Sequence, residues 1–354
     1  MKVTFGGDAM LGRLVAETMQ TQGPDYPLEA VADVFRSADL GVVNLECAVT
    51  SNPARWAGPK AFYFRADPTA APALARAGIG AVSVANNHAL DFGREGLVEM
   101  LELLAHEGIA TFGAGRNRAE ATRPALVPAG DLSVGFIGFT DHPAEFAADE
   151  YRAGVAYLDV LGDPEGSLVE AVRALERSQA SGADLTIVSL HWGPNFDGEP
   201  QPELVRFAHG LIDAGADMIF GHSAHELMGI EVYRGHPILY GAGDLVDDYY
   251  VGDRENDRTA VYTVTWNGRV AERLEVSPCF IRNCRVAPAS PPMRDVIARR
   301  LVDLSARLGT TLRREGELLV VDCTPDAQEQ APFMKQGQGH GQHRHRSRAG
   351  LARG

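Results

Sequence analysis

Two histidines, His222 and His225, follow a short apolar run and are close enough in sequence for their imidazoles to bind one metal ion. The run, residues 218–220, has the pattern of a buried parallel strand, and Gly221 is expected to end it. In open α/β sheets, ligands bind just beyond the carboxyl ends of the strands. Taken alone, the pair is explained equally well by one surface histidine beside one capping histidine.

The same arrangement, an apolar run followed by side chains that can bind metal, occurs four more times. The residues that follow these runs are Asp8, Asn44 with Glu46, residues 86–88 with Asp91, and His191. If the runs are neighbouring strands, their carboxylate, amide and imidazole groups converge at one edge. A mixed oxygen and nitrogen set suits Mn, Fe, Zn or a similar divalent ion. The repetition therefore predicts a metal site rather than a set of helix caps.

The elements that would position these groups alternate between strands and helices and are followed by two antiparallel hairpins. We expect strands at 2–5, 40–43, 81–84, 132–139, 185–190 and 318–321, helices at 28–37, 67–76, 97–107, 168–178, 203–213 and 293–308, and hairpins at 230–240 and 261–274. Residues 288–292 are expected to form a linker. This order predicts a mixed, layered α/β fold.

Composition limits the classes of function. The 354-residue chain has a formal net charge of -14, which argues against a general nucleic-acid-binding surface. Its four cysteines include no Cys-x-x-Cys pair and are expected to be reduced and structural. With no apolar run long enough for a signal peptide or a membrane span, we expect a cytoplasmic protein. The sequence does not specify an oligomeric state.

We expect a main domain at 1–275, a small α/β extension packed on it at 276–325, and a disordered tail at 326–354. The tail is rich in Gly, Gln, His and Arg and has almost no core residues. Its His340, His343 and His345 could bind stray metal, but a solvated tail is the simpler interpretation.

The motifs in order resemble the CapA family, named for poly-γ-glutamate capsule synthesis proteins, within the calcineurin-like metallophosphoesterase superfamily. The resemblance covers roughly residues 1 to 250. The matching motifs are Gly7-Asp8, Asn44-Leu45-Glu46, Ala85-Asn86-Asn87-His88-Ala89-Leu90-Asp91-Phe92-Gly93, His191-Trp192-Gly193, Gly221-His222-Ser223-Ala224-His225 and Tyr240-Gly241-Ala242-Gly243-Asp244.

The resemblance implies a four-layer α/β/β/α sandwich with two divalent ions, Mn, Fe, Zn or Mg, between the sheet ends. It implies as metal ligands Asp8, Glu46, Asn87, His191, His222 and His225, with Glu46 bridging. His88, held by Asp91, would act on the leaving group, and we expect Asp91 to favour the imidazolium form of His88 near neutral pH. We expect substrate contacts from Asn44, Lys60, Arg65 and Trp192, of which the two basic residues would attract an anionic substrate.

Two departures from the superfamily pattern affect the ligand set. The opening Asp-x-His is Asp8-Ala9-Met10 here, so one histidine is absent. The closing Gly-His-x-His is Gly-His-x-x-His, so either His222 or His225 is expected to lie off the metal.

Three functions remain open. The first is phosphoester hydrolysis by a metal-activated water. The second is metal-dependent acid/base chemistry or amide hydrolysis on a peptide or poly-γ-glutamate substrate, with Asp8 and a histidine as the acid/base pair. The third is a non-catalytic role in polymer synthesis. The expected partner in each case is an anionic small molecule or polymer.

Overall fold

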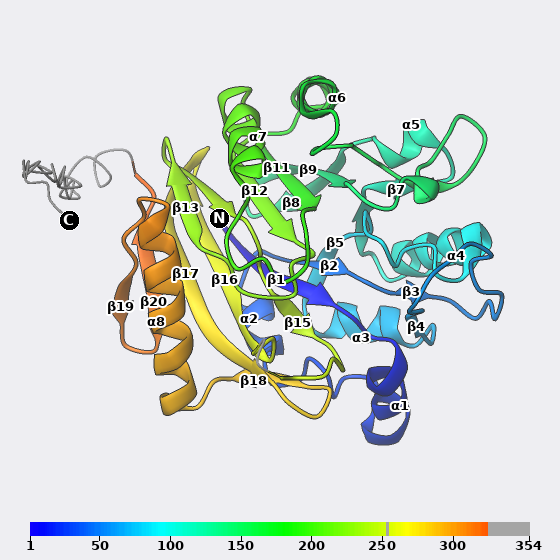
Figure 1. Ribbon diagram of the computed structural model, residues 1–354, viewed down its shortest axis with the longest axis horizontal. Helices are drawn as coiled ribbons and strands as arrows, with labels where there is room; N and C mark the ends of the chain where they lie inside the picture. The colour runs from blue at the N-terminus through cyan, green and yellow to red at the C-terminus, as the bar shows by residue number, and fades with distance from the viewer. Residues whose placement is uncertain (253–254, 325–354) are drawn as a thin grey trace, which may run out of the picture.

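Two β-sheets lie face to face in the computed structural model, which describes residues 1–252 and 255–324 (Figure 1). The larger, ten-stranded sheet has the order β19 (Arg313–Glu315), β20 (Leu318–Asp322), β17 (Val270–Ile281), β16 (Arg258–Asn267), β1 (Lys2–Ala9), β2 (Leu40–Leu45), β5 (Ile79–Ser83) and β6 (Ala110–Phe112), with β15 (Asp244–Val246) paired to β1 and β18 (Val286–Pro288) to β17. The six-stranded sheet has the order β13 (Ile230–Tyr233), β14 (His236–Leu239), β12 (Met218–His222), β11 (Leu185–His191), β9 (Leu132–Thr140) and β8 (Ala125–Ala129).

Helices cover the outer faces of both sheets. The larger sheet packs against α1 (Arg13–Gln22), α2 (Ala32–Arg36), α3 (Ala70–Arg76) and α4 (Gly93–His106), and the smaller against α6 (Pro164–Ala180) and α7 (Pro202–Asp213). The long helix α8 (Pro291–Arg307) contacts β17 and β13, one strand from each sheet. Shorter elements are α5 (Arg118–Ala121), a 3-10 turn (Ala144–Phe146), and the pairs β3 (Ala48–Val49) with β4 (Arg65–Ala66) and β7 (Ala114–Gly115) with β10 (Gly154–Val155). The expected four-layer α/β/β/α sandwich is confirmed.

The inner faces of the two sheets form one apolar layer. The rings of Phe5 on β1 and Phe220 on β12 lie 5.2 Å apart, and those of Phe112 on β6 and Phe136 on β9 lie 5.1 Å apart. Every residue of β2 is buried because helices cover one face and the second sheet covers the other. These packed sheets fix the positions of the strand ends.

Most expected elements are present, with three corrections. The first helical turn expected at residue 28 is a series of turns, and α2 begins only at Ala32. Residues 288–292 are not a linker, because Pro288 ends β18 and Pro291 occupies the first turn of α8, where its missing N–H costs nothing. Gly221 does not end its strand, since β12 continues to His222. A Cβ at Gly221 would lie 2.4 Å from the Tyr240 carbonyl oxygen, so the close approach is real.

The expected C-terminal extension adds to the larger sheet. Strand β17 runs through residues 275 and 276, and β20 pairs with it along Arg273–Val276. The expected tail at 326–354, with its three histidines, lies outside the described residues. Within the described ranges, none of the helices combines the length and apolar character needed to cross a bilayer.

Candidate metal centre

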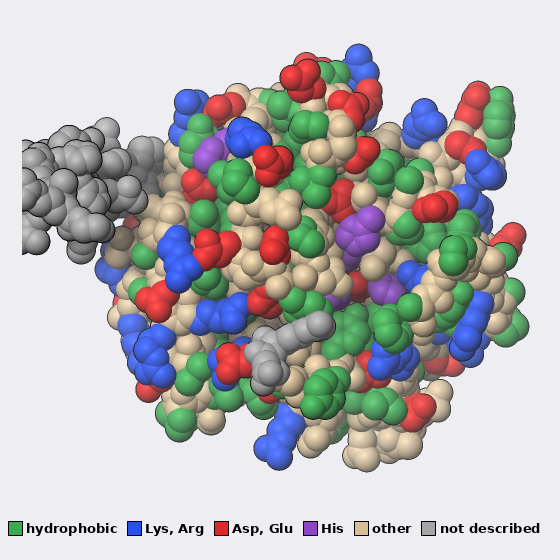
Figure 2. Space-filling model, viewed as in Figure 1, with side chains coloured by type: hydrophobic (Ala, Val, Ile, Leu, Met, Phe, Trp, Pro, Cys, Tyr) green, Lys and Arg blue, Asp and Glu red, His purple; other side chains and the backbone are tan. Residues whose placement is uncertain are grey.

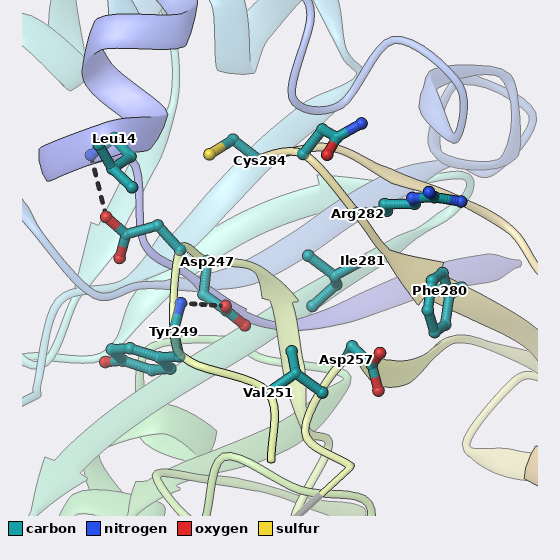
Figure 3. Close-up of a pocket in the computed structure, with 11 residues that line it drawn as sticks. Leu14, Asp247, Tyr249, Val251, Asp257, Phe280, Ile281, Arg282 and Cys284 are labelled. Atoms are coloured by element: carbon teal, nitrogen blue, oxygen red, sulfur yellow. Dashed lines mark hydrogen bonds between the residues drawn. The ribbon is translucent and has the colours of Figure 1, made fainter.

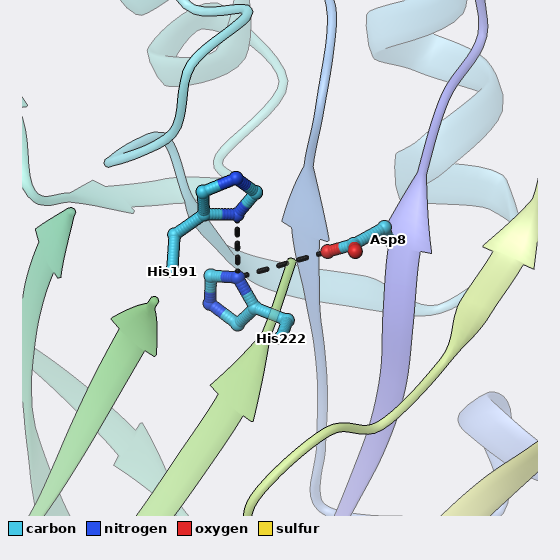
Figure 4. Close-up of side chains that lie close together, drawn as sticks. All are labelled: Asp8, His191 and His222. Carbon is cyan, nitrogen blue, oxygen red and sulfur yellow. Dashed lines mark hydrogen bonds and ion pairs between the residues drawn. The ribbon is translucent and has the colours of Figure 1, made fainter. Parts of the chain in front are cut away.

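The strand ends that carry the expected ligands meet between the two sheets. In the larger sheet, parallel pairing sets Asp8 of β1 opposite Asn44 of β2 and also opposite Asp244 of β15. In the smaller sheet, parallel pairing sets His191 of β11 opposite His222 of β12. Figure 4 shows the two imidazoles and the Asp8 carboxylate pointing toward one another from these strands. Register within each sheet and packing between the sheets therefore assemble the cluster.

Two Gly-Asp pairs allow β1 and β15 to approach closely. A Cβ on Gly7 would lie 1.7 Å from the carbonyl oxygen of Gly243, a distance that no side chain tolerates. The backbone N–H of Asp8 donates a hydrogen bond to the same oxygen, at 3.0 Å. The absent side chain at Gly7 thus permits the contact that sets the Asp8 and Asp244 carboxylates side by side.

Two groups of metal-competent side chains share Asp8. The ligand atoms within each group lie within 4.8 Å of one another, and the groups are Asp8, His191 and His222, and Asp8, Glu46, His225 and Asp244. Nδ1 of His222 lies 3.6 Å from Oδ1 of Asp8, and Nδ1 of His225 lies 3.7 Å from Oδ2. One carboxylate can thereby serve two ions, one in each group. Both His222 and His225 belong to such a group, although the sequence suggested that one would lie off the metal.

Glu46 stands at the centre without a partner. Its side chain is fully buried, and neither carboxylate oxygen accepts a hydrogen bond. Oε1 lies 3.9 Å from Nε2 of His88 and of His191, and 4.0 Å from Nε2 of His225. Native proteins rarely leave buried polar atoms unsatisfied. Nε2 of His191 and Oδ2 of Asp244 are also unpartnered, so this donor set fits divalent cations placed among these atoms.

Hydrogen bonds behind the cluster orient its members. The Asn44 amide donates to Oδ1 of Asp8 at 2.7 Å, and the Asn86 amide donates to Oδ1 of Asn44 at 3.0 Å. Nε2 of His222 lies 2.8 Å from the Ser189 hydroxyl, and Nδ1 of His225 lies 2.8 Å from Asp244. Such outer contacts fix ring orientation and tautomer in metal sites. Asn44, for which we expected a substrate contact, is fully buried and holds the Asp8 carboxylate.

His88 forms a separate unit beside the cluster. Its Nδ1 lies 2.7 Å from Oδ2 of Asp91, and its ring stacks on Phe64 with centroids 3.9 Å apart. Asp91 is held further by the Lys60 ammonium, 3.0 Å from Oδ1. Lys60 also donates to the backbone carbonyl of Asn87. With Nδ1 engaged, Nε2 of His88 is left to face Glu46.

In the described part of the chain, the residues of this centre are most exposed on the side of His88 and His225. His88 and His225 keep 6% and 5% of their surface exposed, whereas Asp8, Glu46, His191 and His222 are fully buried. Figure 2 shows histidine side chains, in purple, in the hollow near the middle of this face. A ligand would therefore enter from the side of His88 and His225.

Burial dominates the protonation of the acids. It raises the pKa of Glu46 well above its usual value, and the neighbouring Asp8 and Asp244 raise it further. Burial likewise raises the pKa of Asp244 well above its usual value, with Asp8 adding to the effect. The pKa of Asp8 is raised by burial despite the opposing effect of His225. Three carboxylates this close therefore need cations nearby to ionise together.

Burial also keeps the imidazoles neutral. It lowers the pKa of His222 to about 3, and it lowers the pKa of His191 well below the usual value, with His222 adding to the effect. Neutral imidazoles are the form that binds metal. For His88 the sequence suggested that Asp91 would favour the imidazolium near neutral pH. That expectation is wrong for the protein alone, because burial outweighs Asp91 and lowers the His88 pKa to about 4.

Two expected site residues, Trp192 and Arg65, make their contacts outside the two groups. Trp192 is buried in the core, where its ring lies parallel to Tyr240 and its Nε1 donates to the Tyr240 carbonyl. Arg65 donates to the Asn52 carbonyl and lies over the Phe92 ring. For Asn87, which we also expected to be a ligand, the side-chain Oδ1 is buried and has no hydrogen-bond partner.

Sequence reasoning missed Asp244 as a ligand candidate. Asp244 ends one of the motifs that match the family, Tyr240-Gly241-Ala242-Gly243-Asp244, but we assigned it no role. The available signal was the repeated Gly-Asp pair, since Gly243-Asp244 repeats Gly7-Asp8. The position of the absent histidine is occupied by Met10, whose side chain packs in the core.

A family model and two related proteins match most of this chain. The family model described as "Bacterial capsule synthesis protein PGA_cap" matches residues 2–249. A "Probable polyglutamine synthesis accessory protein" of Mycobacterium tuberculosis is 36% identical over 295 residues, covering 79% of this chain and 76% of that protein. The "PGA biosynthesis protein CapA" of Bacillus subtilis is 29% identical over 290 residues, covering 81% of this chain and 73% of that protein.

Solved structures show more distant likeness. A hypothetical protein from Thermus thermophilus aligns with a TM-score of 0.49 and 16% identity, covering 78% of this chain and 98% of that one. The NAD nucleotidase of Haemophilus influenzae aligns with a TM-score of 0.43 and 12% identity, covering 84% of this chain and 55% of that one. At such low sequence identity, the functions of these proteins say nothing about the function of this chain.

Proposed function

We propose that this chain, which belongs to the PGA_cap family of bacterial capsule synthesis proteins, is a metal-dependent hydrolase that cleaves phosphoesters. The family match confirms the expected resemblance to the CapA family. The reaction and its substrate are our proposal. Two divalent ions would be held by the two groups that share Asp8, and the other ligands would be His191, His222, Glu46, His225 and Asp244.

One observation carries the proposal. The buried Glu46 carboxylate has two unpartnered oxygens and faces three imidazole nitrogens at 3.9–4.0 Å, too far for hydrogen bonds. Neutral imidazoles do not compensate a buried carboxylate, but a cation bound by both would. Divalent ions in such a centre lower the pKa of a bound water and stabilise charge on phosphoryl oxygens.

The remaining roles belong to the residues at the solvent edge. His88 is fixed by Asp91 at Nδ1 and by stacking on Phe64, so its Nε2 would take up a proton beside an anionic substrate and pass it to the leaving oxygen. Lys60, bound to Asp91, supplies positive charge at the same edge, where an anionic substrate would enter. Asn44 and Ser223 fix the Asp8 carboxylate by donating to its two oxygens.

A second function has support from the relatives. Those named above are called polyglutamine or PGA biosynthesis proteins, and the same centre could polarise an amide carbonyl of a glutamyl polymer. Asp8 and a histidine would then move the proton. For a non-catalytic assembly role, the expected feature is a metal site of low occupancy.

The test uses the full chain loaded with Mn²⁺ or Zn²⁺, its metal content measured by elemental analysis. We expect turnover of bis-p-nitrophenyl phosphate or p-nitrophenyl phosphate that EDTA abolishes and added metal restores. A γ-glutamyl oligopeptide is assayed in parallel, in deuterated water as well, because hydrolysis or deuterium uptake there would favour the second function. Metal-loaded protein that turns over none of these substrates would refute both hydrolytic proposals.

A further inference from the structure

A cavity of about 380 Å³ lies beside the metal centre (Figure 3). Its walls come from the start of α1, from the segment after β15 and from the end of β17. Tyr249 forms part of the wall and packs edge-on against His225, with ring centroids 5.0 Å apart. A molecule seated in the cavity would therefore lie one aromatic ring away from a metal ligand.

Two carboxylates in the wall have unused oxygens. Asp247 is 4% exposed; its Oδ1 accepts a hydrogen bond from the Tyr249 N–H, its carboxyl group also shares a hydrogen bond with that of Asp244, and no N–H donor reaches its Oδ2. The Asp248 side chain is 1% exposed, and its Oδ2 receives the Leu14 N–H and the Arg13 guanidinium while its Oδ1 has no partner. In Figure 3 the Asp247 carboxyl group lies between Tyr249, Ile281 and Val251, facing the cavity. Unpaired buried carboxylate oxygens call for a hydrogen-bond donor, preferably a charged one.

The cavity does not fit a third metal ion. Among the described residues, neither group of three or more metal-competent side chains includes Asp247 or Asp248. The rest of the wall is partly apolar, with Leu14, Val251 and Ile281, and it also carries one charged side chain of each sign, Asp257 and Arg282. Two acceptors beside aliphatic surface match an ammonium on an alkyl chain, because the ammonium has three donors and the chain packs on the apolar wall.

We propose that this cavity is a specificity subsite that binds the primary ammonium group of a substrate whose other end reaches the metal centre. This inference rests on the proposed hydrolytic function and adds the chemical class of substrate group recognised next to it. Asp247 and Asp248 would accept N–H bonds from the ammonium, and the aliphatic stem would lie against Val251 and Ile281.

Binding is tested without turnover, by calorimetry on the full chain with n-butylammonium as the probe. We expect wild-type protein to bind it, Asp248→Asn to bind about 10- to 100-fold more weakly because a charge-assisted hydrogen bond is lost, and butyrate not to bind. Val251→Trp, which narrows the cavity at a residue 43% exposed, should also weaken binding. Asp303→Asn, an exposed carboxylate by another cavity, is the matched control and should behave as wild type.

Equal n-butylammonium binding by wild type, Asp248→Asn and Val251→Trp would overturn the proposal, as would butyrate binding equal to that of the amine. Loss of one Mn²⁺ equivalent in Asp248→Asn would overturn it too, by making the cavity a metal site.

A kinetic comparison separates this inference from the function on which it rests. Mn²⁺-loaded enzyme should prefer 4-aminobutyl phosphate to n-butyl phosphate about 10-fold in kcat/KM, and Asp248→Asn should lose that preference. Turnover of both esters with no preference for 4-aminobutyl phosphate would refute the subsite. Binding of n-butylammonium with no turnover of either ester would refute the hydrolase proposal.

Discussion

Glu46→Gln should stabilise the metal-free protein while it lowers the metal content. The Glu46 side chain is fully buried and both its oxygens lack partners, so without a cation it destabilises the fold. Glutamine has the same shape and no charge, and its amide N–H groups face the neutral Nε2 atoms around it. Polar groups that bind ligands are often retained at a cost in stability.

The magnitude follows from the environment. An unsatisfied buried polar group costs about 1–3 kcal/mol, and removing the charge recovers part of that. For a chain of 354 residues, about 1 kcal/mol corresponds to roughly 2 °C in Tm. We therefore expect the Tm of the EDTA-treated variant to exceed that of wild type, by at most about 6 °C. In excess Mn²⁺ the order should reverse, because only wild type gains the full binding free energy.

Differential scanning calorimetry with elemental analysis checks this prediction, and Glu231→Gln is the matched control. Glu231 is satisfied, since it accepts from the Tyr240 hydroxyl at 2.6 Å and pairs with His209 at 3.0 Å. Its substitution should not raise Tm and should leave metal content unchanged. If Glu46→Gln melts below wild type without metal, or if it binds as much Mn²⁺, the reasoning about the unpartnered carboxylate is wrong.

Three further outcomes are expected. His191→Ala should lose about one metal equivalent by elemental analysis, whereas His209→Ala, which removes a stack on Tyr233 outside both groups, should keep its metal. His88→Ala should keep its metal and lose about 10²- to 10⁴-fold in kcat, and unchanged kcat would make His88 structural. Arg300→Ala should lower the free energy of unfolding by about 1–3 kcal/mol, because the 8%-exposed Glu226, 2.5 Å from Arg300, would lose its cation. Denaturant titration measures this loss, and a variant as stable as wild type would show that the ion pair contributes nothing.

The short apolar runs determined much of the fold before any tertiary contact was considered. Their length and composition predicted β1, β2, β5, β9, β11 and β12, and polar residues at their ends predicted that a metal centre would form there. This inference is local, because a strand's end and the residue that follows it are adjacent in sequence. In the structure the strand ends do bring together residues named from the sequence, in two groups that share Asp8. These residues are Asp8, Glu46, His191, His222 and His225.

Tertiary structure alone decided where a side chain points and what surrounds it. Trp192 follows His191 directly, yet it turns into the core, and Asp244 reaches the centre only because Gly7 lets β15 cross close to β1. The His88 pKa depends on burial, to which the stacked Phe64 ring contributes, and this outweighs the neighbouring Asp91. Sequence patterns report which residue types lie at a strand end, whereas desolvation and side-chain direction depend on contacts between segments distant in the chain, and these contacts exist only after the sheets pack.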